Sequence, residues 1–237
     1  MNSDIQQVFE KIQSFTREAK HNLILHDQLF DSGPEVIKLI SKKGGNVFST
    51  FQKLVIDNLI LYFSKLIDAP KMGSNDNLSL LKLAEMIEID DVDLFNKIKS
   101  KMDNIISKAR KFKQQRHKRV AHSDEAYHFN REDGDSLGFS FDDIDKTLNL
   151  IGIFLNEIEL HYHNSETAYE HLRITVGNDA NALLTRLRKA ERYDKLIQKI
   201  RSDMTPEEEG NHIMEEPDAL QLIAPAINRS QKKEEAR

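Results

Sequence analysis

Two residues with complementary chemistry, Arg116 and His122, lie six positions apart near the middle of the chain. Histidine is the side chain that gains and loses a proton near neutral pH, and arginine is a permanent, forked cation that matches phosphate oxygens. Cleavage of RNA needs both roles, because a base takes the proton of a ribose 2′-hydroxyl while a fixed cation stabilises charge on the phosphate. This pair is therefore the leading candidate for a catalytic site.

The segment around the pair is strongly basic, although the whole chain has a net charge of -5. From residue 108 to residue 122 it holds seven cations and no acid: Lys108, Arg110, Lys111, Lys113, Arg116, Lys118 and Arg119. The rest of the chain must then sum to about -12, so the basic segment stands out against an acidic body. We expect Lys113, Lys118 and Arg119 to contact an RNA backbone, with an affinity that falls as salt rises.

Helical geometry restricts how the pair could act. Six residues of unbroken α-helix turn through about 600°, which leaves the two side chains about 120° apart. They converge only if the helix loosens near Val120 and Ala121, or if a second copy of the chain brings its own pair across a two-fold axis. A purely structural interpretation stays open, because cations and a histidine near a helix C-terminus also offset the helix dipole and cap its carbonyl groups.

Composition narrows the class of protein. A hydrophobic content of 39% with 31% charged residues is ordinary for a soluble globular chain. Without cysteine, the chain has no disulfides, thiolate catalysis or cysteine zinc sites. The sequence shows no apolar run of the roughly 20 residues that a bilayer span needs, and no phosphate-loop, metalloprotease or serine-elbow motif. We expect no signal peptide, because the first residues lack its basic and apolar regions. We expect a cytoplasmic protein without a cofactor, a metal or a membrane contact.

Apolar residues with helical spacing cover most of the chain and predict an all-α fold without strands. The predicted helices span residues 4–30, 47–68, 78–87, 92–112, 141–172 and 179–202. The helix at 47–68 is apolar on nearly every side, which predicts a position in the middle of a bundle. We expect a surface loop at 123–140, one helical domain over residues 1–204, and a charged tail without its own core over residues 205–237.

A polar stripe crosses this otherwise apolar helix. Asp57, Ser64 and Asp68 fall within roughly 20° of one line along it. The stripe either simply reaches solvent, or faces a functional cleft that contains Arg116, and the sequence allows both interpretations.

The segment "RHKRVAHSD" resembles the arginine-to-histidine signature of the HEPN superfamily. Two further segments resemble its abortive-infection branch, "LVIDNLILYFSKLIDAPKMGSNDNLSLLKL" at 54–83 and "DANALLTRLRKAERY" at 179–193. The similarity spans roughly residues 46 to 200. It implies a HEPN-like helical bundle with long antiparallel helices, a fold shared by many dimeric, metal-independent ribonucleases of prokaryotic toxin and antiphage systems.

Transferred by position, this resemblance assigns Arg116 and His122 to the catalytic pair. His117 stands where such proteins more often have Asn or Asp, and Lys65 stands where arginine is expected. Asp68, in "SKLIDAP", lies in a segment typical of the branch. The candidates for supporting roles are His117, Asp68, Asp124, Ser64 and Lys65.

The resemblance implies an endoribonuclease that acts on single-stranded RNA or on exposed loops such as those of tRNA. His122 would be the general base or acid, Arg116 would stabilise the pentacovalent phosphate, and the products would be a 2′,3′-cyclic phosphate and a 5′-hydroxyl. The expected partners are RNA, a second copy of the chain and a cognate antitoxin or inhibitor. The alternative is a non-catalytic helical protein that holds RNA, a nucleotide or a partner on the same basic segment.

Overall fold

The computed structural model describes residues 1–121, 138–172, 174–175 and 177–202. The chain divides into two compact units, Met1–Leu184 and Thr185–Arg237. The described part consists of α-helices apart from two short helical turns of other types and one small hairpin, which confirms the predicted all-α fold.

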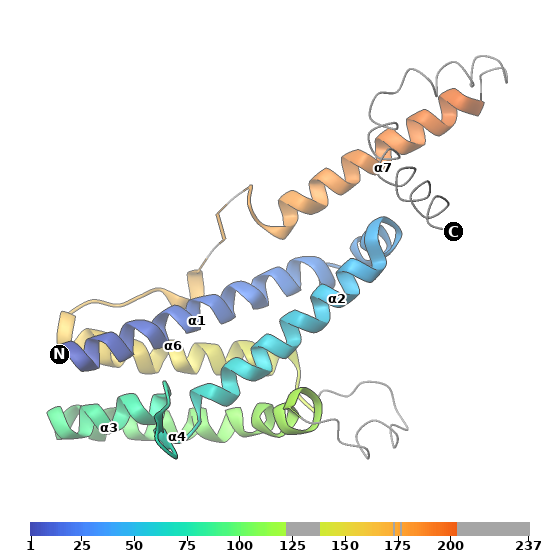
Figure 1. Cartoon of the computed structure of the whole chain (residues 1–237). Helices are drawn as coiled ribbons and strands as arrows, with labels where there is room; N and C mark the ends of the chain where they lie inside the picture. Colours follow the sequence, from blue (N-terminus) through green and yellow to red (C-terminus); the bar gives the residue numbers. More distant parts are fainter. Residues whose placement is uncertain (122–137, 173, 176, 203–237) are drawn as a thin grey trace, which may run out of the picture. The chain divides into compact units, whose positions relative to one another are not determined.

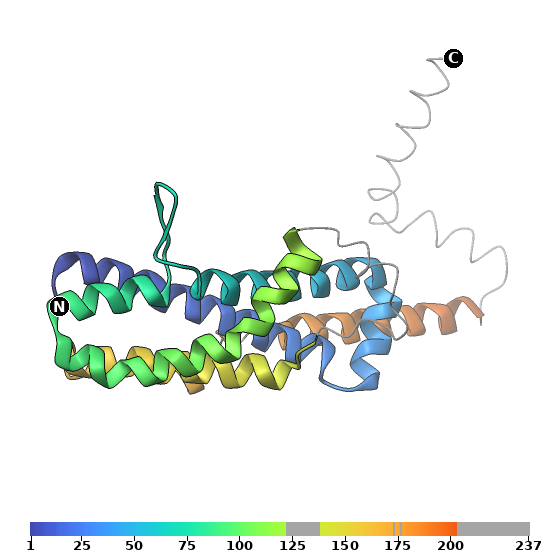
Figure 2. The same cartoon turned by 90° about the horizontal axis from the view of Figure 1, so that it is seen from below.

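The first unit contains four long helices that lie side by side: α1 (Ser3–Phe30), α2 (Pro34–Leu66), α4 (Val92–Gln115) and α6 (Phe141–His163) (Figures 1 and 2). The short helix α3 (Leu80–Asp90) packs against α1 and α4. The facing side chains form one apolar core, in which Ile12, Leu59, Ile105 and Ile151 have no exposed surface. Burial of these stripes of apolar side chains drives the helices together.

Side chains at the helix starts satisfy backbone N–H groups that would otherwise lack partners. The carboxylate of Asp91 accepts a hydrogen bond from the backbone N–H of Leu94 at 2.9 Å, so α4 begins directly after α3. At the start of α6, Ser140 and Asp143 form a capping box in which each side chain accepts from the other residue's backbone N–H. Such caps typically contribute about 1 kcal/mol each.

Helix α2 differs from the predicted helix at 47–68. It begins at Pro34 and continues through a kink at Gly44, where φ is 168° and ψ is 44°, and it ends at Leu66. The prediction that it is buried all round was wrong, because the side chains of Val47 and Leu54 are 72% and 60% exposed. Asp68 lies beyond the C-terminus of α2.

Helix α6 ends nine residues earlier than the predicted boundary at residue 172. Asn164 adopts the left-handed conformation, with φ 50° and ψ 39°, and its backbone N–H donates to the carbonyl of Leu160. Asparagine tolerates this conformation better than most residues, so it ends helices as glycine does. A single 3-10 turn, η2 (Tyr169–His171), follows.

Between α2 and α3, strands β1 (Lys71–Met72) and β2 (Asn75–Asp76) form an antiparallel hairpin that projects from the helices (Figure 2). The sequence did not predict these strands, because two-residue strands leave no alternating pattern. Gly73, with φ 63°, supplies the turn.

Helix α7 (Ala180–Ser202) begins where the carboxylate of Asp179 accepts from the backbone N–H of Ala182 at 3.0 Å, one residue after the predicted start. The division between the two units falls within this helix. The predicted loop over 123–137 and the predicted tail over 205–237 lie outside the described residues, and the domain boundary at residue 204 stays a prediction.

A glycine-to-alanine replacement tests the packing of η2 on α6. A Cβ atom on Gly152 would lie 2.9 Å from the Cβ atom of Tyr169, closer than a contact allows. We expect Gly152→Ala to lower the free energy of unfolding by about 1–3 kcal/mol, measured by urea denaturation. Gly45→Ala is the matched control, since a Cβ there meets nothing within 4 Å, and it should leave stability unchanged or slightly raised. Equal effects of both replacements would contradict the packing described here.

Candidate functional site

Arg116 stands where the helix type changes. α4 ends at Gln115, and Arg116–Ala121 form a π-helix, η1. A π-helix closes hydrogen bonds between residues five apart, and short π-helical segments occur frequently at functional sites. The segment η1 contacts α2, and Figure 2 shows the chain bending from α4 toward α2 at this point. The regular α-helix therefore ends ahead of Val120 and Ala121, near which one of the two ways for Arg116 and His122 to converge needs it to loosen.

Asp68 joins two of the cations at the end of α4. Its Oδ1 atom accepts a hydrogen bond from Lys113 Nζ at 2.8 Å, and its Oδ2 atom lies 3.4 Å from Arg116 Nη1. The Asp68 side chain is only 20% exposed and that of Arg116 is 30% exposed, so the ion pair is partly shielded from water. The contact between Asp68 and Arg116 agrees with the second interpretation of the polar stripe, in which the stripe faces a cleft that contains Arg116.

The Arg116 guanidinium can bind a further anion. A guanidinium carries five N–H donors, and Asp68 engages the Nη1 atom. The remaining donors lie on a side chain that still reaches solvent. The arrangement therefore offers a forked cation, fixed at one edge by a carboxylate, to a phosphate group arriving from outside.

Ser64 has a structural role. It is fully buried, and its hydroxyl donates to the carbonyl of Ile60 at 2.8 Å and to that of Phe112 at 3.4 Å. The second bond ties α2 to α4 one turn before Arg116. Ser64 thus supports the site from inside the core and does not face solvent.

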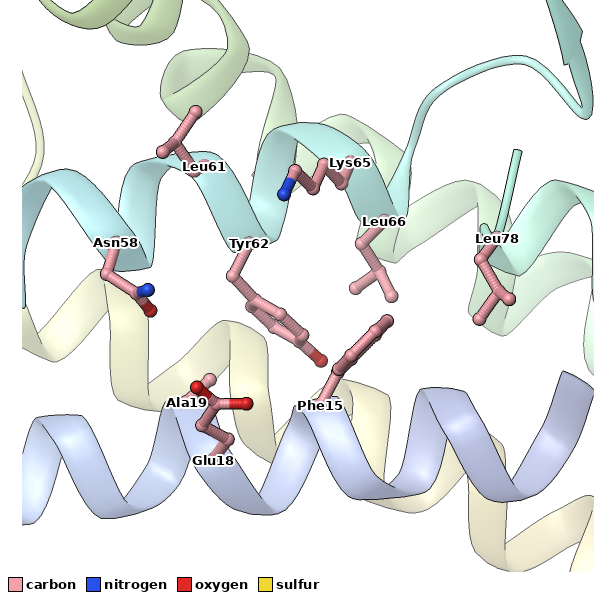
Figure 3. Close-up of a pocket in the computed structure, with 9 residues that line it drawn as sticks. All are labelled: Phe15, Glu18, Ala19, Asn58, Leu61, Tyr62, Lys65, Leu66 and Leu78. Atoms are coloured by element: carbon pink, nitrogen blue, oxygen red, sulfur yellow. The ribbon is translucent and has the colours of Figure 1, made fainter. Parts of the chain in front are cut away.

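Lys65 lines a different part of the surface. Its side chain borders a pocket of about 240 Å³ between α1 and α2, together with Phe15, Glu18 and Tyr62 (Figure 3). The structure therefore does not place Lys65 with Lys113 and Arg116 in the cluster around Asp68.

The other candidate residues lie on or after η1. His117 and Lys118 are exposed on η1. The side chain of Arg119 and all of His122 and Asp124 lie outside the described residues. The convergence of Arg116 with His122 therefore stays a prediction.

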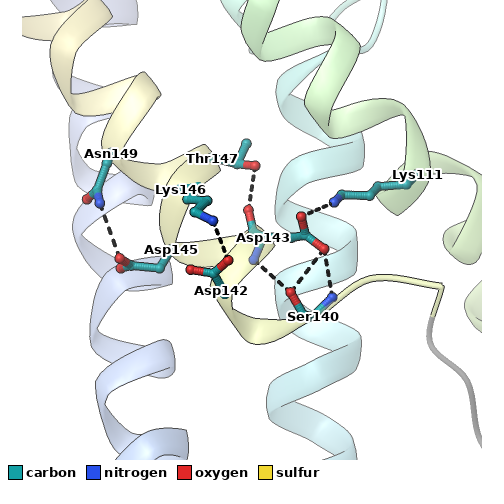
Figure 4. Close-up of polar contacts among 8 residues, drawn as sticks. All are labelled: Lys111, Ser140, Asp142, Asp143, Asp145, Lys146, Thr147 and Asn149. Atoms are coloured by element: carbon teal, nitrogen blue, oxygen red, sulfur yellow. Dashed lines mark hydrogen bonds and ion pairs between the residues drawn. The ribbon is translucent and has the colours of Figure 1, made fainter.

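A second anchor of the basic segment, which the sequence did not predict, is the ion pair between Lys111 and Asp143 (Figure 4). Lys111 Nζ lies 2.6 Å from Asp143 Oδ1, and the backbone N–H of Ser140 donates to Asp143 Oδ2 at 2.9 Å. The Lys111 hydrogen bond, followed by that of Ser140, lowers the pKa of Asp143 to about 2. The spacing of Ser140 and Asp143 is a capping-box signal that could have located the start of α6, although not its partner on α4.

Among the described residues, no group of three or more His, Asp and Glu side chains is arranged to hold a metal ion. No helix in the same part of the chain combines the length and the apolar character that crossing a membrane requires.

The fold and the site define a helical-bundle protein in which a partly shielded arginine lies at the end of one bundle helix. The family model HEPN_AbiU2, described as AbiU2, matches residues 5–183. Because this match covers well over half of the chain, the protein belongs to the AbiU2 family of HEPN abortive-infection proteins. The match begins earlier than the resemblance recognised from residue 46, since it includes α1. No curated protein and no solved structure matches the chain.

The depressed pKa of Asp143 predicts a pH-dependent contribution to stability. Its folded-state pKa of about 2 lies below the ordinary value of 3.8, so the stabilisation is complete well above pH 4 and is lost as pH falls through about 2. We expect Asp143→Asn to lower the free energy of unfolding at pH 7 by about 1 kcal/mol, because solvent screens this partly exposed pair. The difference from the parent protein should shrink as the pH of the urea titration is lowered from 4 toward 2.

Asp142→Asn is the matched control for Asp143→Asn. Asp142 is 66% exposed and, among the residues that the structure describes, pairs only with Lys146 one turn away, so its replacement should cost less than about 0.5 kcal/mol. If Asp143→Asn lowers the free energy of unfolding as much at pH 2 as at pH 7, the carboxylate charge is not the cause of the loss.

Proposed function

We propose that this protein is a metal-independent endoribonuclease of a toxin or abortive-infection system, acting on single-stranded RNA or exposed RNA loops. The observation that carries the proposal is the position of Arg116, held by Asp68 beside Lys113 at the point where α4 gives way to η1. Membership of the AbiU2 family supports the biological setting.

In the proposed reaction, His122 takes the proton from a ribose 2′-hydroxyl, and the resulting oxygen attacks the adjacent phosphorus. The bond to the 5′-oxygen breaks, and this leaving oxygen takes up a proton. The products are a 2′,3′-cyclic phosphate and a 5′-hydroxyl. Arg116 binds the non-bridging phosphate oxygens and stabilises the charge that accumulates on them in the pentacovalent transition state.

Asp68 acts in this scheme as a positioning residue for Arg116. An arginine side chain has several rotatable bonds, and an ion pair at one edge of the guanidinium limits the orientations that it samples. Lys113 shares the same carboxylate, so it adds positive charge next to the site. Lys118 and Arg119 then contact neighbouring phosphates, and the affinity for RNA falls as salt rises.

The proposed enzyme is a homodimer. An interface around a two-fold axis places the same surface of both copies together, so two Arg116 and His122 pairs would line one site. The exposed apolar side chains of Val47 and Leu54 support this arrangement, because they lie on α2, which contacts η1. A cognate antitoxin or inhibitor is the further proposed partner, since a ribonuclease active in its own cell must be restrained.

One observation favours a non-catalytic alternative. Asp68 already pairs with both Lys113 and Arg116, which gives both cations a structural reason to be there. Under this alternative, the basic segment binds RNA, a nucleotide or a partner in a salt-dependent manner without cleaving anything.

A cleavage assay in EDTA separates the two functions. We expect purified protein to cut RNA and leave 2′,3′-cyclic phosphate ends, and Arg116→Ala or His122→Ala to slow cleavage by at least about 100-fold. Arg110→Ala is the matched control, because it removes one exposed cation from the same helix and should stay within about threefold of the parent. Cleavage that survives replacement of both Arg116 and His122 would refute the assignment. RNA binding without any cleavage would favour the alternative.

Asp68→Asn tests the positioning role. Asparagine keeps the size of the side chain but loses its charge, so Arg116 becomes less well oriented. We expect kcat to fall by about 10- to 100-fold while KM changes little and the melting temperature stays close to that of the parent. Asp76→Asn is the control, since Asp76 is an exposed acid that pairs with Lys82 in the hairpin region. A faster Asp68→Asn enzyme would mean that Asp68 competes with the phosphate for Arg116.

A further inference from the structure

A second concentration of positive charge lies on α7. Between Thr185 and Ser202 this helix has seven cations and two acids. Four of the cations are Arg188, Arg192, Lys195 and Lys199. At about 100° per residue, their spacing keeps them within about 60° of one line along the helix. All four are exposed, and together they are called here the α7 basic stripe.

The α7 basic stripe differs from the basic segment of α4. The cations of α4 point in all directions around that helix, and Lys111, Lys113 and Arg116 are paired with acidic side chains of α6 or of the chain after α2. Within the described part of the chain, Arg188 and Arg192 have no acidic partner.

The positive charges of the other two cations of the α7 basic stripe are also compensated only slightly. Lys199 also has no acidic partner among the described residues, and Lys195 lies 3.5 Å from Glu191 on an exposed surface. Like charges four residues apart destabilise a helix by a few tenths of a kcal/mol each. A row of them is therefore costly unless an anionic ligand compensates the charge.

The length of the α7 basic stripe suits a polyanion. The twelve residues from Arg188 to Lys199 rise by about 16 Å along the helix axis. Phosphates of one nucleic-acid strand recur every 3.4 Å or so along a duplex axis, so a stripe of this length reaches several of them at once. A single bound phosphate or carboxylate would leave most of the stripe uncompensated.

The chemistry of the other faces of α7 disfavours a lipid surface. A helix that lies on a membrane needs a continuous apolar face opposite its cations. On α7 that side carries Ala190 and Ile197, with Tyr193 farther round the helix, but Arg186 interrupts it. The acid Asp194 borders the same side, where anionic headgroups would repel it.

We infer that α7 is an RNA-binding element, in which the α7 basic stripe contacts successive phosphates of an RNA strand. The contact is with the backbone, so it is sensitive to salt and tolerant of base sequence. It requires neither Arg116 nor His122, and it goes beyond the proposed ribonuclease function. Where both functions hold, α7 adds affinity for RNA without taking part in the chemistry.

The test uses the full chain and a fluorescein-labelled 2′-O-methyl RNA oligonucleotide. The methyl group removes the hydroxyl that would attack the phosphate, so binding is measured by anisotropy without cleavage. The stripe variant is Arg188→Gln with Arg192→Gln. The matched control is Arg186→Gln with Lys189→Gln, which removes the same charge from the same helix but off the stripe. Circular dichroism checks that each variant retains its helical content.

We expect the stripe variant to reduce the slope of log affinity against log salt by about 1.4, and to weaken binding on the order of tenfold at 0.1 M salt. The off-stripe control should change affinity by no more than about twofold, because it removes no phosphate contact. Glu191→Gln frees Lys195 and should tighten binding by up to about fivefold, a gain that misfolding cannot produce.

Equal losses in the two double variants would overturn the inference, since they would reflect net charge alone. The inference would also be overturned, in favour of a lipid surface, if the parent protein bound phosphatidylserine vesicles but not RNA and the stripe variant lost the vesicle binding. Stripe-dependent binding by a parent protein that cuts no RNA would defeat the ribonuclease proposal and leave this inference standing.

Discussion

The site depends on the packing of three aromatic rings beneath it. Phe63 of α2 and Phe112 of α4 are fully buried and stack with ring centroids 4.4 Å apart, and Phe139, just before α6, lies 4.7 Å from Phe112. Phe112 precedes Arg116 by one helical turn, and Phe63 lies in the last turn of α2 before Asp68. Fixing these rings against one another therefore sets the distance between the carboxylate and the guanidinium.

Magnitudes show which of these interactions holds the site together and which orients it. Full burial of a phenylalanine side chain contributes about 1.5–3 kcal/mol, and an aromatic pair adds about 0.5–1.5 kcal/mol. The ion pairs of Lys111, Lys113 and Arg116 are partly exposed, and such pairs contribute about 1 kcal/mol or less each. Packing therefore brings α2, α4 and α6 together, while the acids decide where the cations point.

The sequence predicted the features that follow from periodicity and missed those that depend on contacts between elements. The spacing of apolar residues located α1 and α4, and the phase of α2 put Asp68 on a polar stripe for which a cleft with Arg116 was one of two interpretations, although the helix ends at Leu66. The burial of Ser64 could not be predicted, since a serine hydroxyl can bond to the preceding turn of its own helix and so remain inside a core. The end of α6 at Asn164 rests on a left-handed backbone that no periodicity encodes.

Charge density along a sequence and charge density on a surface are different quantities, and this chain separates them. The segment at 108–119 has the higher density of cations along the sequence, but helical rotation spreads them around α4, and two acids of other segments pair with three of them. On α7 the cations are interleaved with apolar and acidic residues, so the sequence looks unremarkable, yet the helical repeat aligns four of them on one exposed line. A few paired cations are suited to orient one phosphate, whereas an uncompensated row of cations is suited to bind many. Binding of an RNA strand and chemistry on one of its phosphodiester linkages are therefore best served by different helices.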